Sequence, residues 1–119
     1  MENKNALVYK VGKYGKAISD TNRVLILKML GSLPEDTVKV GDIAQYLHIS
    51  QPAATKHLQI LHDVNLISRK KVGSTVYYSV NKDTLNDFEQ LMKYCFERVS
   101  HPCEYQFDCD HCPNAETCI

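Results

Sequence analysis

The chain has 119 residues, of which 44% are hydrophobic and 24% are charged, a composition that fits one compact globular domain and excludes a multidomain enzyme. Its 14 basic and 14 acidic residues cancel to a net charge of zero. The apolar runs are far shorter than a membrane span, and the N-terminus lacks the profile of a secretory signal, so we expect a cytoplasmic protein with no membrane partner.

The charges are unevenly distributed along the chain. Residues 50–82 carry five positive charges and one negative charge, whereas residues 83–119 carry two positive and eight negative charges. A basic middle segment is what a phosphate-binding surface needs, and the alternative is a row of lysines that only solvates a strand.

The first third of the chain is predicted to be helical. Apolar spacing predicts a helix over residues 5–18, a second one that Ser19 or Asp20 caps and that ends at residues 31–34, and a third over residues 40–48. The residues expected to be buried are Leu7, Val11, Tyr14 and Ile18 in the first helix, Val24, Leu27, Met29 and Leu30 in the second, and Ile43, Ala44 and Leu47 in the third.

Ser50 is expected to cap a fourth helix, which ends at Asn65 in a left-handed conformation. The period then changes, and residues 66–72 and 75–80 are predicted to form a hairpin around Gly73-Ser74. A last helix is expected over residues 82–99 and ends before His101-Pro102. The apolar stripes are Ala54, Leu58 and Leu61 in the fourth helix, and Leu85, Phe88, Leu91, Met92, Cys95, Phe96 and Val99 in the last.

Two short helices, a tight turn at residues 48–50 and a hairpin predict a winged helix-turn-helix, a mostly α fold with a small β-hairpin wing (α+β). The outer face of the fourth helix can reach base edges, and the basic hairpin can follow phosphates. A scaffold of the same shape that binds protein is the alternative. The predicted DNA-binding residues are Gln51, Thr55, Lys56 and Gln59 of the helix, with Arg69, Lys70, Lys71 and Ser74 of the hairpin.

Three segments, Ala17–Leu27, Ser50–Leu61 and Lys70–Tyr78, follow one another at spacings typical of a known family. They resemble the second-helix signature, the recognition helix and the wing of the ArsR/SmtB (arsenic-repressor-like) transcriptional regulators of prokaryotes. The resemblance implies a homodimeric repressor whose first and last helices form the dimer interface, and whose partner is an inverted-repeat operator in double-stranded DNA.

Position by position, the same resemblance places Gln51, Pro52, Thr55 and Lys56 at base contacts, and Lys70 and Lys71 at backbone contacts. Pro52 replaces a hydroxyl residue that is common in the family, and Ser74 replaces the usual wing arginine. The family's two best-known metal sites have no counterpart, because residues 40–47 lack a Cys-x-Cys pair and residues 82–99 lack histidine.

The last 17 residues carry four of the five cysteines, Cys103, Cys109, Cys112 and Cys118. Four thiolates at this spacing can wrap one tetrahedral soft ion, for which zinc is the first choice and an iron–sulfur cluster a close second. An arsenite-like thiophilic ion would need three of them, and a reversible disulfide switch or an acidic extension with incidental thiols are further alternatives. A metal that pins this tail could change the spacing of the two recognition helices and so modulate operator binding.

The sequence therefore divides into a winged helix-turn-helix DNA-binding and dimerisation domain over residues 1–100 and a Cys-rich acidic tail over residues 101–119. We interpret Cys95 as a small core residue rather than a fifth ligand. The chain has no phosphate loop or catalytic motif, so we expect no enzyme activity. The alternative function is a redox-active or metal-buffering protein that does not bind DNA, for which basic wing residues would have no use.

Overall fold

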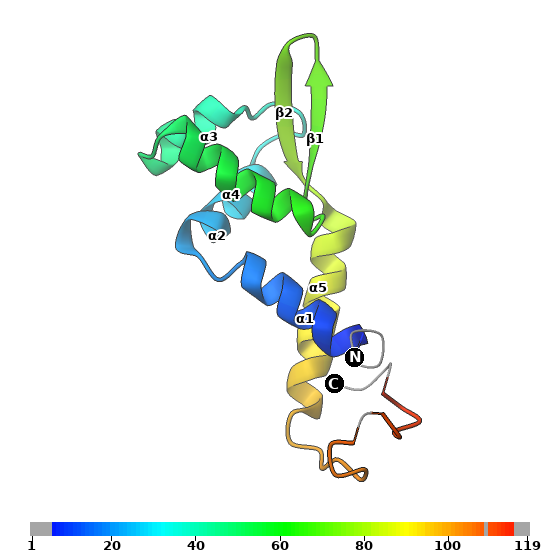
Figure 1. The fold of residues 1–119 in the computed structure, drawn as a ribbon. Coiled ribbons are helices and arrows are strands. Elements are labelled where there is room, and N and C mark those ends of the chain that lie inside the picture. The colour runs from blue at the N-terminus through cyan, green and yellow to red at the C-terminus, as the bar shows by residue number, and fades with distance from the viewer. Residues whose placement is uncertain (1–5, 109, 116–119) are drawn as a thin grey trace. The chain divides into compact units, whose positions relative to one another are not determined.

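The computed structural model describes residues 6–108 and 110–115, so Cys109 and Cys118 lie outside the described residues. Along the described residues the elements follow one another in the order α1 (Ala6–Ala17), α2 (Thr21–Ser32), α3 (Val40–Leu47), α4 (Gln51–Asp63), β1 (Ile67–Val72), β2 (Thr75–Val80) and α5 (Lys82–Arg98), with the labels of Figure 1. The chain forms two compact units, residues 16–85 and residues 1–15 with 86–119. No helix in the described part of the chain is long and apolar enough to cross a membrane.

The core of the unit 16–85 is built from α2, α3, α4 and the base of the hairpin. Burial of these side chains removes large apolar areas from water and holds the three helices together. Its largest fully buried side chains are Ile26, Ile43, Leu58, Leu61, Leu66 and Ile67. The mostly α fold with a small hairpin is the predicted one.

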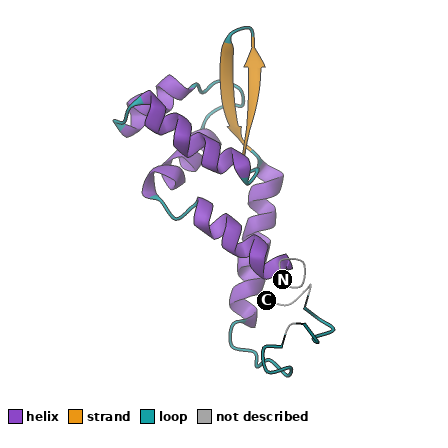
Figure 2. Ribbon diagram, viewed as in Figure 1, coloured by secondary structure: helices purple, strands orange, loops and turns teal. Residues whose placement is uncertain are grey.

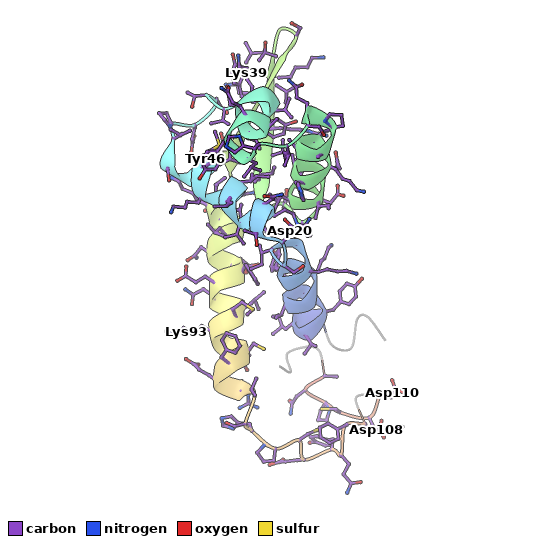
Figure 3. The ribbon with its side chains drawn as sticks, turned by 90° about the vertical axis from the view of Figure 1, so that its left-hand side faces the viewer. Asp20, Lys39, Tyr46, Lys93, Asp108 and Asp110 are labelled. Atoms are coloured by element: carbon purple, nitrogen blue, oxygen red, sulfur yellow. The ribbon has the colours of Figure 1, made fainter. Side chains whose placement is uncertain are left out.

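Local capping rules define the helix ends, as the sequence predicts. The Asp20 carboxylate accepts a hydrogen bond from the Asn22 amide at 2.8 Å, and it lies at the start of α2 (Figure 3). The Ser50 hydroxyl oxygen accepts one from the Ala53 amide at 3.2 Å. Asn65 adopts a φ of 66° after α4, which confirms the predicted left-handed turn.

The hairpin is the predicted wing. Its strands pair in antiparallel register from Ile67 opposite Val80 to Val72 opposite Thr75, and Gly73 turns with a φ of 62°. The loop between α2 and α3 pairs with the other edge of β2, because the Tyr78 amide donates to the Val38 carbonyl at 2.8 Å. The hairpin extends beyond the helices of this unit (Figure 2).

In the other unit, α1 lies against α5 around Tyr14. Its ring meets that of Phe88 with centroids 5.0 Å apart, and its hydroxyl donates to the Asp87 carboxylate at 3.1 Å. Lys10 completes the group with an ion pair to Asp87 at 2.8 Å.

Two expectations about buried residues are wrong. Val24 is 49% exposed, and Ile26 and Leu30 are the buried residues of α2. On α5 only Phe88 is buried, Cys95 is half-buried, and Phe96 and Val99 are each 70% exposed. Apolar spacing identifies a face that avoids water, but it does not say whether that face packs within the same chain.

Candidate nucleic-acid interface

Helix α4 has one face in the core and one face in solvent. Ala54, Leu58 and Leu61, each no more than 1% exposed, anchor it from the inside. Because the helix has 3.6 residues per turn, the positions between these anchors point outward. The predicted DNA-contacting side chains of α4 are all exposed: Gln51, Pro52, Thr55, Lys56 and Gln59.

One of the outward side chains of α4, Gln59, is held by a neighbour on the same helix. The Gln59 amide nitrogen donates to the Asp63 carboxylate at 2.7 Å, one helical turn away. This contact uses one of the two N–H donors of the Gln59 amide and leaves the other donor and the carbonyl oxygen for another partner. The first turn of the helix offers a phosphate few backbone amides, because Pro52 has no N–H and the Ala53 and Ala54 amides both donate to Ser50.

The wing presents its predicted basic residues to solvent. Arg69, Lys70, Lys71 and Ser74 are all exposed. Lys70 lies opposite Tyr77 in the register and forms a 3.7 Å ion pair with Asp36 of the loop between α2 and α3. Asp36 has a φ of 58°, and its amide donates to the Ser79 hydroxyl at 2.9 Å, so the loop carboxylate is held beside the wing.

The sequence prediction assigned no role to Arg23, which connects three helices. Its Nε donates to the Ala17 carbonyl at 2.5 Å, and its Nη1 contacts His57 Nδ1 on α4 at 3.1 Å. These partners are 6 and 34 residues away, so no local pattern indicates the contact.

The cysteine tail is described only in part. Cys103 and Cys112 are free thiols, and each sulfur accepts a backbone hydrogen bond at 3.4 Å, from the Phe107 and Asn114 amides respectively. Asp108, labelled with Asp110 in Figure 3, lies 2.7 Å from the His111 ring nitrogen. Within residues 6–108 and 110–115, no three metal-ligating side chains are grouped as a metal site.

Comparison with known proteins relates this architecture to transcriptional regulators. The family model described as "Bacterial regulatory protein, arsR family" matches residues 20–69. The chain is 40% identical to the transcriptional repressor SdpR of Bacillus subtilis over 72 residues, which cover 60% of this chain and 77% of SdpR. It is 31% identical to the arsenical resistance operon repressor of the same organism over 85 residues, which cover 71% and 79% of the two chains.

A solution structure from Mycobacterium bovis, a homodimeric winged helix-turn-helix DNA-binding domain, superposes with a TM-score of 0.63 at 25% identity, covering 87% of this chain and 96% of that one. The relatives named here are transcriptional regulators, which agrees with the prediction that the chain is not an enzyme. The chain belongs to the arsR family of bacterial regulatory proteins and carries the DNA-binding domain of a transcriptional regulator.

Proposed function

We propose that the chain is a homodimeric repressor that inserts α4 into the major groove of an inverted-repeat operator and lays the wing along the DNA backbone. One observation carries this proposal: a capped helix anchored by three buried residues turns all five predicted DNA-contacting side chains to solvent, beside an exposed basic wing. Thr55 and Lys56 read base edges, while Lys70 and Lys71 bind phosphates.

Replacing Thr55 and Lys56 together with alanine is expected to abolish specific operator binding without unfolding the chain, because both side chains are exposed. The probe is a duplex that the wild-type chain selects from a random-sequence library, here called the selected duplex, and footprinting measures its protection. Lys93→Ala, an exposed lysine of α5, is the matched control for lost charge.

Normal footprinting by the Thr55→Ala/Lys56→Ala variant would contradict the assignment of the recognition helix. A metal carrier that does not bind DNA would select no duplex at all.

Lys70→Ala is expected to lower the slope of log affinity against log salt by about one unit, as a phosphate contact does.

A second chain is proposed to cover the apolar side of α5. Phe96 and Val99 are each 70% exposed in the single chain, and exposed apolar side chains of this size on one helix are typical of protein interfaces. The homodimeric structure from Mycobacterium bovis supports the same assembly. Residues 1–100 would then form the DNA-binding and dimerisation domain, and residues 101–119 the regulatory tail.

The tail is proposed to bind a thiophilic metal ion through Cys103, Cys109, Cys112 and Cys118, with zinc as the first choice. Cys103 and Cys112 are free thiols, and a sulfur ligand is what a soft ion prefers. When bound, the metal would cross-link the tail and thereby modulate operator binding. The similarity to an arsenical resistance operon repressor supports a thiophilic ion as the ligand.

The absorption spectrum of protein purified without oxygen, with metal and sulfide counted on the same sample, tests the tail. About one zinc per chain and no visible colour is the expected result, and a Cys103→Ser/Cys112→Ser variant should lose the zinc. A brown protein that contains iron and acid-labile sulfide would mean that the tail binds an iron–sulfur cluster rather than zinc. A metal-free protein would favour the disulfide switch or an arsenite-like inducer.

A further inference from the structure

Arg23 has two separate hydrogen bonds to two different helices. Its Nε donates at 2.5 Å to the carbonyl of Ala17, the last residue of α1, where helical carbonyls lack partners within the helix. Its Nη1 contacts His57 Nδ1 at 3.1 Å. Because a guanidinium can only donate, His57 Nδ1 is the acceptor in this hydrogen bond.

His57 is well placed to transmit this contact to the DNA-binding face. It belongs to α4 and directly follows Lys56, one of the proposed base-contacting residues. Both Arg23 and His57 are half-buried, where a hydrogen bond to a charged group is stronger than in open solvent. The buried side chains of α4 are all apolar. Their packing fixes how deeply the helix sits in the core, but because such contacts are non-directional they only weakly restrain sliding of the helix along its own axis.

We propose that Arg23 is a positioning residue for operator recognition: it sets the placement of α4 by tying His57 to the C-terminal end of α1. This inference rests on the proposed function, since it needs α4 to read DNA. A side chain that reads a base must be held to about 0.5 Å, so a helix released from this tie loses base contacts before it loses phosphate contacts.

The inference is tested with a double-mutant cycle on the full chain. Arg23→Lys keeps the charge, but one ammonium cannot replace a fork that reaches two helices. His57→Leu removes the acceptor, whereas His57→Asn restores an oxygen at the position of Nδ1. The affinities for the selected duplex and for a mixed-sequence duplex are measured by fluorescence anisotropy, and His62→Leu on the same helix is the control.

Arg23→Lys and His57→Leu are each expected to weaken binding to the selected duplex about tenfold, while the double variant is no weaker than either single variant. Binding to the mixed-sequence duplex should change much less, and His57→Asn should retain most of the affinity. A purely structural role would lower the folded fraction and reduce both affinities together.

Additive losses in the cycle, or equal losses on the two duplexes, would overturn the inference while leaving DNA binding by α4 intact. If the wild-type chain selects no duplex, the proposed function fails first, and the inference fails with it. If Arg23→Lys does not fold, the contrast between His57→Leu and His57→Asn decides the question, since equal affinities of these two variants would overturn the inference.

Discussion

Asp87 is the residue on which the contact between α1 and α5 centres. The hydrogen bond from Lys10 holds the pKa of the Asp87 carboxyl below its usual value, against the opposing effect of burial. Burial, and then the hydrogen bond to Asp87, raises the pKa of the Tyr14 hydroxyl. The carboxylate form of Asp87 is therefore favoured by folding, and so is the neutral form of Tyr14.

Asp87→Asn is expected to lower the free energy of unfolding at pH 7 by about 0.5 kcal/mol, a small value because the Lys10 and Asp87 side chains are each 45% exposed. Since folding depresses the pKa of Asp87, its contribution is present above the unfolded pKa of about 3.9 and is lost as the pH falls through the folded value. Urea denaturation at pH 7 and at pH 2.5 measures this difference.

The wild-type and Asp87→Asn chains should therefore differ at pH 7 and converge at pH 2.5. Glu89→Gln, an exposed carboxylate on the same helix, is the control and should leave the unfolding free energy nearly unchanged. A difference that persists unchanged at the lower pH would mean that the charge of Asp87 does not carry the effect.

Among the elements, the wing is held by the loop that precedes α3. Val38 pairs with β2, and the Asp36 carboxylate faces Lys70 at 3.7 Å. With Lys70 bound to phosphate as proposed, the Asp36 carboxylate would compete with DNA for this lysine, so it would weaken DNA binding while it orders the side chain.

Asp36→Asn is expected to raise the affinity for the selected duplex about two- to threefold, because Lys70 is released while the amide of residue 36 can still donate to Ser79. Fluorescence anisotropy at several salt concentrations measures the gain, which should shrink as salt rises. Glu35→Gln removes the same charge from the neighbouring position. An equal gain in both variants would mean that only the net charge matters.

The elements themselves were largely predictable from the sequence, because their signals are local. Ser50 caps α4, Asn65 ends it, and Gly73-Ser74 sets the hairpin register. The contacts of Arg23 with His57 and of Asp36 with Lys70 were not predictable, since each joins residues 34 positions apart in segments that no periodicity links. Which exposed residues touch DNA is still a prediction.

For the whole molecule, the apolar side of α5 is the main unexplained surface of the single chain. The sequence predicted Phe96 and Val99 to be buried, and in the single chain each is 70% exposed. A second chain is the simplest way to remove them from water.

Phe96→Glu is expected to convert the dimer into a monomer at micromolar concentration, because a charge in an apolar interface is costly to bury. Sedimentation velocity measures the assembly. Phe107→Glu is the matched control, since Phe107 is 85% exposed in the tail rather than on α5. If the Phe96→Glu chain sediments like the wild type, the dimer interface does not include Phe96 and lies elsewhere on the chain.

The two compact units are joined at Gly15–Lys16 and at Leu85–Asn86, and both joints lie inside continuous helices, α1 and α5. Proteases cut most readily where the backbone is exposed and can be drawn into an extended form, which a helical segment resists. Limited digestion should therefore nick the loops within the units and the segment after α5 before it separates the units. A protease that separates the two units would have to unfold both α1 and α5 locally, because either joint alone still connects the units.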